Sequence, residues 1–371
     1  MSLVYKKRVK QNRKVMKLSL NKKDQAKLLK LFECKNINVA LGDLLMEYFL
    51  QNRDFAPIES KQEMANKMVK FWNEGYLDRD DCAILSELVT PNIEEVNPAI
   101  ITENPYFSAV KIPEIHLSNV EYKNIKYHPY QAFARDEIEV DSNYREYSKV
   151  GYFKEEMNFP ALTNKYGIWM AIIPNEIFTM APAIEKAHGH VLTYGLGLGY
   201  FAYMCHLKED VKSITIVEKD KHVIDLFNQY IRPYFDEKKC PISIIKCEAF
   251  SFETRQHYDY AFVDIYHDPS DGLPVFVRFM KRKKKMDIDE LDFWLKESLY
   301  AYYRRLMIYV FECVNDGLGD EHFSHSENQI DDIINEIYCK TKKMEFNDYN
   351  SIHRFLSKGS IDDLLTPYRF K

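Results

Sequence analysis

Apolar residues recur at helical spacing through the first ninety residues of the chain. Asn21 and Asp24 read as an N-cap followed by an acid in the first turn, and apolar positions 28, 29, 31 and 32 continue an amphipathic helix. Three further helices are expected over residues 39–50, from the capping box of Ser60 and Glu63 to Gly75, and through residues 82–88 as far as Pro91. We therefore predict a helical N-terminal region over residues 1–90.

The pattern changes after Pro91. Six prolines separate short segments up to residue 166, and some segments alternate apolar and polar residues as β-strands do, for example IHLSNVEYKNIKY. We interpret residues 91–166 as a connector with short strands.

From residue 190 onward, apolar runs typical of buried strands alternate with helical patterns. Strands are expected over residues 190–195, 213–218, 241–250 and 258–266, with helices over residues 199–207 and 222–231. This alternation predicts an α/β fold with a doubly wound, Rossmann-like parallel sheet that is covered on both faces.

The last part of the chain is expected to be mainly helical. We predict a helix over residues 289–303, a strand or continued helix over residues 306–312, and a helix capped by Ser326 and Gln329 that runs to about residue 342. The expected domains are the helical region 1–90, the connector 91–166, a Rossmann-like domain 167–320 and a C-terminal helical extension 321–371.

The composition adds limits to this picture. Of the 371 residues 46% are apolar, which is enough for two domains, and no apolar run is long enough to cross a bilayer. The basic N-terminus is not followed by the apolar stretch of a signal peptide, so we expect a cytoplasmic protein. The seven cysteines include no C-x-x-C pair and the histidines do not cluster, so we expect reduced thiols and no metal site.

Positive charge is concentrated at the N-terminus. Residues 1–30 hold eleven Lys and Arg and one acid, while the whole chain has a net charge of −5. Such an arm is compatible with nucleic-acid binding, and the alternatives are a solvated helix face or docking on the acidic body of the same protein. The run KRKKK at residues 281–285 is either a solvated loop or a segment that attracts an anionic substrate.

The stretch VLTYGLGLGY at residues 191–200 carries the first candidate chemistry. Gly195 permits a tight bend after the first strand, Gly197 allows a ligand to approach the backbone, and Gly199 lets the next helix start close to the sheet. The spacing is G-x-G-x-G rather than the G-x-G-x-x-G of dinucleotide sites. The glycine spacing alone is also compatible with a turn that has only a structural role.

The ends of the next strands supply polar partners for this turn. Glu218 ends the second strand, where a carboxylate can accept both hydroxyls of a ribose. Glu248 ends the third strand, within reach of an adenine edge, and the small Ala249 leaves room for that ring. At the end of the fourth strand, Asp264 and His267 are the candidate bases, and capping or solvated roles are their alternatives.

These motifs, GLGLG, VEKD, CEAF and YDYAFVDIYHDP, resemble in order and spacing the cofactor half of the class I S-adenosylmethionine-dependent methyltransferases. Within that superfamily the chain is similar to the spermidine synthase-like branch. The resemblance covers about eighty residues, from position 191 to 269, and implies a methyltransferase fold for the Rossmann-like domain.

The resemblance also implies a ligand and roles. Gly195, Gly197 and Gly199 would border the methionine part of S-adenosylmethionine, Glu218 would hold its ribose, and Glu248 with Ala249 would flank its adenine. The implied activity is methyl transfer to a small-molecule substrate that the sequence does not name.

Three questions stay open at this level. An aminopropyltransferase would use the acids at 264, 268 and 271 to hold a diamine, and an adenosyl-ligand binder without activity would keep only the fold. Asn175 or Glu176 in IPNEIFTM could fold over the cofactor, although a capped helix start explains both. The helical N-terminal region could bind a macromolecule or form a homo-oligomer interface.

Overall fold

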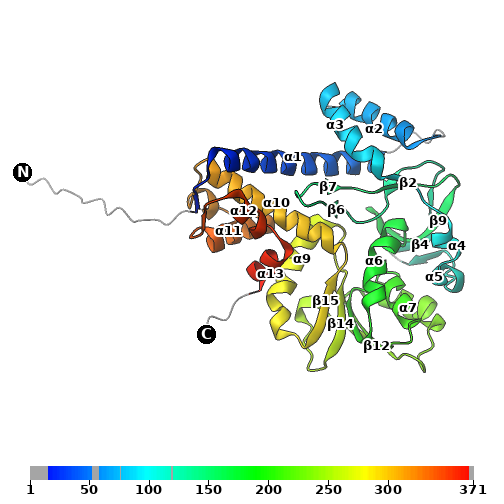
Figure 1. The fold of residues 1–371 in the computed structure, drawn as a ribbon. Coiled ribbons are helices and arrows are strands. Elements are labelled where there is room, and N and C mark those ends of the chain that lie inside the picture. Colours follow the sequence, from blue (N-terminus) through cyan, green and yellow to red (C-terminus); the bar gives the residue numbers. More distant parts are fainter. Residues whose placement is uncertain (1–15, 52–57, 76, 118–119, 367–371) are drawn as a thin grey trace, which may run out of the picture. The chain divides into compact units, whose positions relative to one another are not determined.

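A computed structural model describes residues 16–51, 58–75, 77–117 and 120–366 (Figure 1). Residues 1–15, which hold the most basic part of the predicted arm, lie outside this description. The chain divides into two compact units, one formed by Met1–Lys35 with Tyr303–Lys371 and one formed by Asn36–Tyr302. Among the described residues, no helix has the length and apolar character needed to cross a membrane.

The larger unit contains a parallel sheet of five strands in the order β13-β12-β11-β14-β15. The strands are β11 (Gly189–Tyr194), β12 (Val211–Glu218), β13 (Ile242–Lys246), β14 (Tyr258–Val263) and β15 (Ile288–Phe293). Their residues are largely buried because a parallel sheet is covered by other elements. The fold of this unit is therefore mixed α/β and Rossmann-like, and all five strands end at one edge of the sheet.

Helices connect these strands, as the sequence pattern predicts. They are α6 (Pro174–Lys186) before β11, α7 (Tyr200–His206), α8 (Lys221–Leu226) and α9 (Pro269–Arg282). The ring of Phe201 on α7 stacks on that of Phe262 on β14, with 4.2 Å between ring centroids. The four strands and two helices expected from residue 190 to 266 are thus present, and α8 ends in a π-helical turn, Phe227–Ile231.

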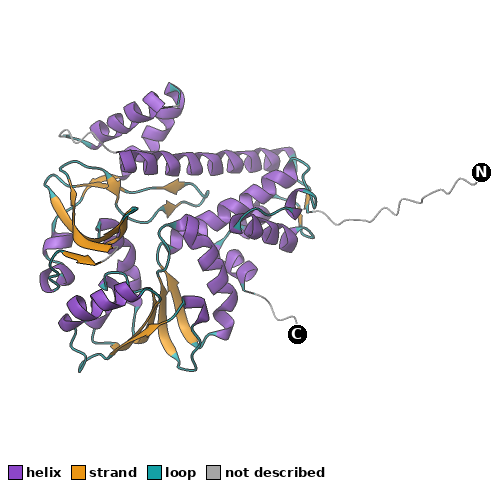
Figure 2. Ribbon diagram, turned by 180° about the vertical axis from the view of Figure 1, so that it is seen from behind, coloured by secondary structure: helices purple, strands orange, loops and turns teal. Residues whose placement is uncertain are grey.

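A separate antiparallel sheet precedes the parallel one (Figure 2). Its order is β10-β9-β4-β3, formed by β3 (Ile115–Leu117), β4 (Val120–Tyr127), β9 (Met157–Asn164) and β10 (Gly167–Ala171). Smaller sheets contain β2 (Ile93–Glu95), β5 (Phe133–Ala134), β6 (Glu139–Val140), β7 (Glu146–Tyr147) and β8 (Val150–Tyr152). Two short helices, α4 (Ala99–Thr102) and α5 (Pro105–Ala109), lie between β2 and β3.

The N-terminal helices are α1 (Lys22–Gln51), α2 (Lys61–Gly75) and α3 (Arg79–Val89). The predicted cap is confirmed, since the Asp24 N–H donates to Asn21 Oδ1 at 3.0 Å. The prediction of two helices before residue 51 is wrong, because residues 30–41 contain no Gly or Pro to interrupt the first one. Trp72, Met68 and Leu45 belong to the buried core of this helical region.

The C-terminal helices are α10 (Lys296–Asn315), α11 (Gln329–Thr341), α12 (Tyr349–Phe355) and α13 (Lys358–Leu365). A two-stranded parallel ladder joins β1 (Lys17–Leu18) to β16 (Glu345–Phe346). Residues 306–312, for which we left strand or helix open, lie in α10.

Two local predictions in this part are wrong. Residues 288–293, placed largely in a predicted helix, form β15, because pairing with β14 buries Leu291 and Phe293 at the end of the sheet. The cap of α11 is Asn328 and not Ser326, because Asn328 Oδ1 accepts hydrogen bonds from the N–H groups of Ile330 and Asp331. The Ser326 hydroxyl instead donates to the Asn328 carbonyl.

Candidate functional site

The glycine turn lies between the end of β11 and the start of α7. Gly195, Gly197 and Gly199 have φ angles of +100°, +52° and +74°. A Cβ on Gly195 would lie 1.9 Å from the Asp264 carbonyl oxygen, and one on Gly199 would lie 2.9 Å from the Phe227 ring. At Gly197 no heavy atom lies within 4 Å of that position. Two glycines therefore allow close packing, and the third leaves open space beside the backbone.

Glu218, at the end of β12, is hydrogen-bonded to this turn. Its Oε2 accepts a hydrogen bond from the Leu196 N–H at 3.1 Å, and its Oε1 accepts one from the Asp220 N–H at 2.8 Å. The side chain is half-buried. An ionised carboxylate has about four acceptor positions. Glu218 can thus accept hydrogen bonds from a ligand while it keeps its bonds to the protein.

Glu248 and Ala249 follow β13. The Glu248 side chain is exposed, and its Oε2 accepts a hydrogen bond from the Phe250 N–H at 2.8 Å, so it caps the short turn Ala249–Ser251. Ala249 is buried, and it lines a cavity of about 270 Å³ together with Tyr194 and Phe252. The Glu248 carboxylate therefore already has a capping role, whereas the space beside Ala249 is open.

Asp264 follows β14 at the centre of the sheet edge. Its N–H donates to the Tyr194 carbonyl at 2.8 Å, which fixes it beside the glycine turn. Burial raises the pKa of its carboxyl from 3.8 to about 7, with a further contribution from the negative charge of Glu218. No described residue forms a hydrogen bond with this carboxyl. The Asp264 carboxyl is thus poorly solvated and has no hydrogen-bond partner in the described part of the chain.

Glu176, in the first turn of α6, is the second acid of this kind. Burial raises the pKa of its carboxyl well above the ordinary value, and the charge of Asp264 raises it further. Within the described ranges its carboxyl also has no hydrogen-bond partner. Its neighbour Asn175 instead donates to the Asp136 carbonyl at 3.4 Å. The sequence offered Glu176 only as an alternative, because nothing local showed that it would meet Asp264.

Glu137 is a third acid with a raised pKa. Burial raises the pKa of Glu137 to about 7, although its Oε1 accepts a hydrogen bond from the Ser298 N–H at 2.7 Å at the start of α10. Burial is the main cause of the raised pKa of the Tyr266 hydroxyl. The charges of Asp264 and Glu137 raise this pKa further, so Tyr266 lies near both acids. The sequence analysis did not single out Glu137, since residues 91–166 showed no motif.

His267 and its neighbours lie at the start of α9. The His267 imidazole is exposed, and its Nδ1 lies 2.9 Å from Asp271 Oδ2. Asp268 accepts a hydrogen bond from the Ser270 N–H at 2.6 Å and forms a capping box with Asp271. These two aspartates therefore stabilise the helix start. His267 affects Asp264 through its charge, which lowers the pKa of that carboxyl.

The segment around α5 supports the glycine turn from the other side. The Tyr106 hydroxyl donates to the Leu198 carbonyl at 2.6 Å, and Asn104 Nδ2 donates to the Tyr200 hydroxyl at 3.0 Å. The rings of Tyr106 and Tyr200 lie edge to face with 5.6 Å between centroids. Sequence reasoning missed both residues, because they lie more than ninety positions from the turn.

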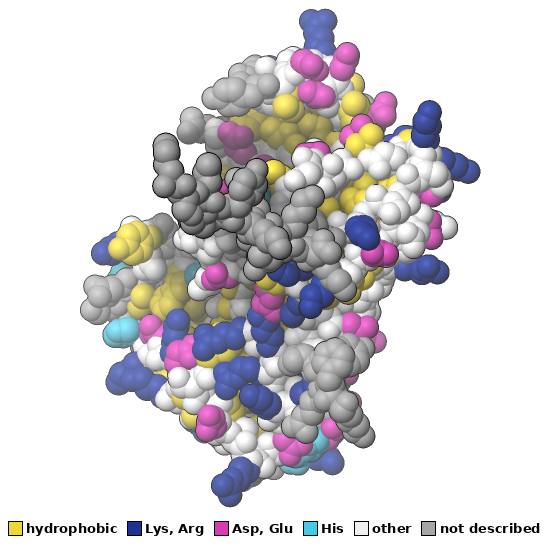
Figure 3. Space-filling model, turned by 90° about the vertical axis from the view of Figure 1, so that its left-hand side faces the viewer, with side chains coloured by type: hydrophobic (Ala, Val, Ile, Leu, Met, Phe, Trp, Pro, Cys, Tyr) yellow, Lys and Arg dark blue, Asp and Glu magenta, His cyan; other side chains and the backbone are white. Residues whose placement is uncertain are grey.

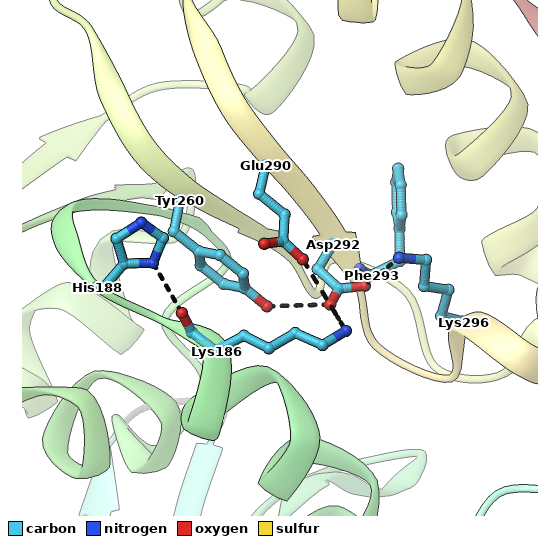
Figure 4. A network of polar contacts seen from close by, with 7 residues as sticks. All are labelled: Lys186, His188, Tyr260, Glu290, Asp292, Phe293 and Lys296. Carbon is cyan, nitrogen blue, oxygen red and sulfur yellow. Dashed lines mark hydrogen bonds and ion pairs between the residues drawn. The ribbon is translucent and has the colours of Figure 1, made fainter.

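A different acid environment occurs on β15 (Figure 4). Asp292 is buried and accepts hydrogen bonds from Lys296 Nζ at 2.8 Å, from Lys186 Nζ at 3.3 Å and from the Tyr260 hydroxyl at 3.1 Å. Burial alone would raise its pKa, but the two lysines lower it below the ordinary value. Asp292 is therefore a fully paired structural acid.

Charged groups also gather away from the sheet edge. At the starts of β14 and β15, ligand atoms of His257, Asp259 and Asp289 lie within 4.8 Å of one another. His257 Nδ1 lies 3.0 Å from Asp287 Oδ1, so ion pairing accounts for this exposed group. Figure 3 shows a face on which Lys and Arg side chains lie close together.

The predicted basic run at residues 281–285 spans the end of α9 and the turn Lys283–Lys285. Arg282 Nη1 donates to the Phe250 carbonyl at 2.7 Å. The guanidinium of Arg278 lies 3.7 Å from the centroid of the Phe250 ring. These two arginines therefore fix the turn that follows β13.

Comparisons with known proteins give a limited result. No family model matches the chain, and no curated protein matches it. A candidate methyltransferase from Thermoplasma acidophilum matches with 22% identity and a TM-score of 0.19, over 24% of this chain and 38% of that chain. The spermidine synthase from Thermotoga maritima matches with 16% identity and a TM-score of 0.26, over 40% of this chain and 59% of its own. The matches span less than two thirds of either structure, and at these scores they carry no weight for function.

Proposed function

We propose that this chain is a transferase that uses S-adenosylmethionine, with methyl transfer as its main reaction. The carrying observation is the pair formed by Asp264 and Glu176, two poorly solvated acids without hydrogen-bond partners among the described residues. They lie at the edge of the sheet that also holds the glycine turn and Glu218. Both acids are half-buried, and poorly solvated acids left unpaired cost stability and are typical of ligand sites.

The strand order supports this location. The chain leaves β11 first toward β12 and β13 and then toward β14 and β15, so the order reverses between β11 and β14. We infer from this reversal that the sheet is doubly wound, with helices on both faces. In such sheets ligands bind beyond the carboxyl ends of the strands at the point of reversal, where Gly195 and Asp264 lie.

The residues present fit the cofactor. Gly197 leaves space beside the backbone for the methionine part, and Glu218 has acceptor positions left for ribose hydroxyls. Ala249 borders an open cavity, and we assign the adenine flank to Ala249 together with the turn that Glu248 caps. S-adenosylmethionine supplies a methyl group activated by its sulfonium centre.

The acid pair would handle charge and protons. Burial raises the pKa of both carboxyls, and the charge of Asp264 raises that of Glu176 further, so Glu176 would keep its proton when Asp264 ionises. The ionised member would hold an ammonium group, and it would accept the proton that an acceptor nitrogen loses as it forms its new bond. We keep His267 as a candidate relay for that proton to solvent, because its imidazole is exposed.

Aminopropyl transfer is the second candidate, and the three acids with raised pKa values favour it. Asp264, Glu176 and Glu137 would suit a substrate that carries several ammonium groups. Asp268 and Asp271 cap α9 and are less available for a diamine. The two candidates share the sulfonium chemistry and differ in whether the cofactor keeps its carboxylate.

Calorimetric titration with S-adenosylmethionine, S-adenosylhomocysteine and decarboxylated S-adenosylmethionine tests the proposal. We expect binding that Glu218→Ala abolishes. The control Glu209→Ala, which changes an exposed acid near the amino end of β12, should leave binding unchanged. Preference for the decarboxylated form would favour aminopropyl transfer. Binding by none of the three would refute the assignment.

Gly197→Ala gives an independent test of the same site. A methyl group meets no neighbour within 4 Å there, and the left-handed conformation costs roughly 1 kcal/mol. We expect a folded protein with much weaker cofactor binding. Unchanged affinity in this variant would contradict the proposed position of the ligand.

A further inference from the structure

A second cavity lies between the antiparallel sheet and the start of α8. Its volume is about 640 Å³, within the usual range of small-molecule sites, ~300–1,000 Å³. Asp264 and Glu176 do not line it. The lining includes His116, Glu121, Tyr166, Trp169, Asp220 and His222.

Aromatic side chains at the β9–β10 hairpin form one wall of this cavity. The Tyr166 side chain is 85% exposed, and the neighbouring Ile168 is 58% exposed. Trp169 is half-buried, and its indole N–H has no hydrogen-bond acceptor among the described residues. Exposed rings beside a cavity offer flat surfaces on which a planar ligand can stack.

Two charged side chains that line the cavity, Glu121 and Lys165, already have partners. Glu121 lies 3.1 Å from His116 Nδ1 and 2.5 Å from Lys123 Nζ. Lys165 Nζ lies 4.7 Å from the centroid of the Tyr166 ring. A cationic ligand would compete with these groups, and an anionic one would meet the carboxylates of Glu121 and Asp220. An uncharged ligand fits this balance best.

We propose that this cavity binds an uncharged heteroaromatic ring of the nucleobase class. The ring stacks on Trp169 and Tyr166, and its N–H groups donate to the carboxylate oxygens of Asp220 and Glu121 that remain accessible. Asp220 Oδ1 accepts hydrogen bonds from the His222 and Val223 N–H groups, which fixes its orientation.

The position of the cavity suggests which molecule the ring belongs to. Asp220 follows two residues after Glu218, the proposed ribose ligand, and donates its N–H to that side chain at 2.8 Å. The cavity therefore borders the proposed cofactor site, and we assign the ring to the acceptor molecule. That assignment rests on the proposed function, whereas ring binding itself does not.

Tryptophan fluorescence tests the binding directly. The chain has three tryptophans, and Trp72 and Trp294 are only 2% and 5% exposed, so Trp169 is the one accessible to a ligand. The full-length protein is titrated with the four common nucleosides and with a short single-stranded oligonucleotide, once alone and once saturated with S-adenosylhomocysteine to block the cofactor site. Excitation at the red edge of the indole band limits absorption by the nucleosides.

We expect saturable quenching by at least one nucleoside, which is absent in Trp169→Phe. Tyr166→Ala should weaken the affinity about tenfold, as loss of one stacking contact does. Ile168→Ala, on the same hairpin but outside the lining, should leave it unchanged. A preference for the oligonucleotide would identify the ring as part of a nucleic acid, and a preference for the nucleoside as part of a small molecule.

Other results would overturn the proposal. These are quenching by none of the probes, equal affinity in Tyr166→Ala and wild type, or stronger quenching by tetramethylammonium than by any nucleoside. Failure of S-adenosylhomocysteine to bind would affect the proposed function alone, since nucleoside quenching is read without it. The two hypotheses can therefore fail separately.

Discussion

Asp264 and Asp292 lie at the ends of neighbouring strands but in opposite environments. Asp292 is hydrogen-bonded to two lysines and a tyrosine hydroxyl, and its pKa is lowered. The Asp264 carboxyl has no hydrogen-bond partner among the described residues, and burial raises its pKa to about 7. An ionised aspartate thus stabilises the folded state on β15 and destabilises it after β14.

The contrast distinguishes an acid with a structural role from an acid with a candidate functional role. A buried acid with complete pairing holds elements together, and here Asp292 joins β15 to α6 and α10 through Lys186 and Lys296. A poorly solvated acid without pairing lowers stability and is retained where a ligand supplies the missing partner. This comparison makes the edge beside Gly195 the candidate site, and the variants below are designed to break or sharpen it.

The largest expected effect on stability is that of Asp292→Ala. Loss of this carboxylate removes the partner of Lys296 and Tyr260 and the nearer of the two acids beside Lys186, and we expect the free energy of unfolding to fall by about 2–4 kcal/mol. Denaturant unfolding measures this. Glu290→Ala is the control, because Glu290 is half-buried on the same strand and lies 3.9 Å from Lys186. Its expected loss is below ~0.5 kcal/mol, and equal losses would contradict the contrast.

Asp264→Asn should change the free energy of unfolding in the opposite direction to Asp292→Ala. The folded pKa of Asp264 lies above its unfolded value of 3.8, so stability falls as pH rises from about 4 through about 7. Removal of the charge should therefore raise the free energy of unfolding by ~1–3 kcal/mol at about pH 8 and abolish transfer. A less stable variant would show that Asp264 has a structural partner that stabilises its charge.

Glu137→Gln should change the dependence of stability on pH by a smaller amount than Asp264→Asn. The folded pKa of Glu137 is about 7, against an ordinary value of 4.5, so its ionisation also costs stability as pH rises between these values. Gln keeps the acceptor for the Ser298 N–H. We expect the stability difference between variant and wild type to grow by ~1–2 kcal/mol from about pH 5 to about pH 8. A difference that is independent of pH would contradict the raised pKa.

The smallest expected effect is that of His267→Gln. The imidazole is exposed and pairs with Asp271 on the surface, and such pairs contribute less than ~1 kcal/mol. We expect nearly unchanged stability and cofactor affinity by calorimetry. A hundredfold fall in turnover with unchanged affinity would identify His267 as the base instead of the Asp264 and Glu176 pair.

Much of the parallel sheet could be predicted from the sequence. The runs that became β11, β12, β13 and β14 are apolar, and glycine and turn residues separate them from the helices. The strand β15 could not be predicted, because IDELDF holds polar residues that also fit a helix. Its pairing with β14 decides its structure, and local sequence does not contain that information.

The candidate site was partly visible in the same way. Gly195, Gly197, Glu218 and Asp264 lie at or just beyond the ends of predicted strands, so their position at one edge could be expected before the structure. Glu176 and Tyr106 could not be placed, because their partners lie far away along the chain. Contacts of this kind arise from tertiary packing and leave no periodic pattern.

Proton release on ligand binding tests the central claim most directly. Calorimetric titration with S-adenosylmethionine is repeated near neutral pH in buffers with different ionisation enthalpies. If a cationic ligand meets Asp264 and Glu176, its charge should lower the raised pKa values of these carboxyls, so binding should release protons and the observed enthalpy should change linearly with the ionisation enthalpy of the buffer. Asp264→Asn should abolish this dependence. Absence of binding, or binding with an enthalpy that is the same in every buffer, would contradict the account.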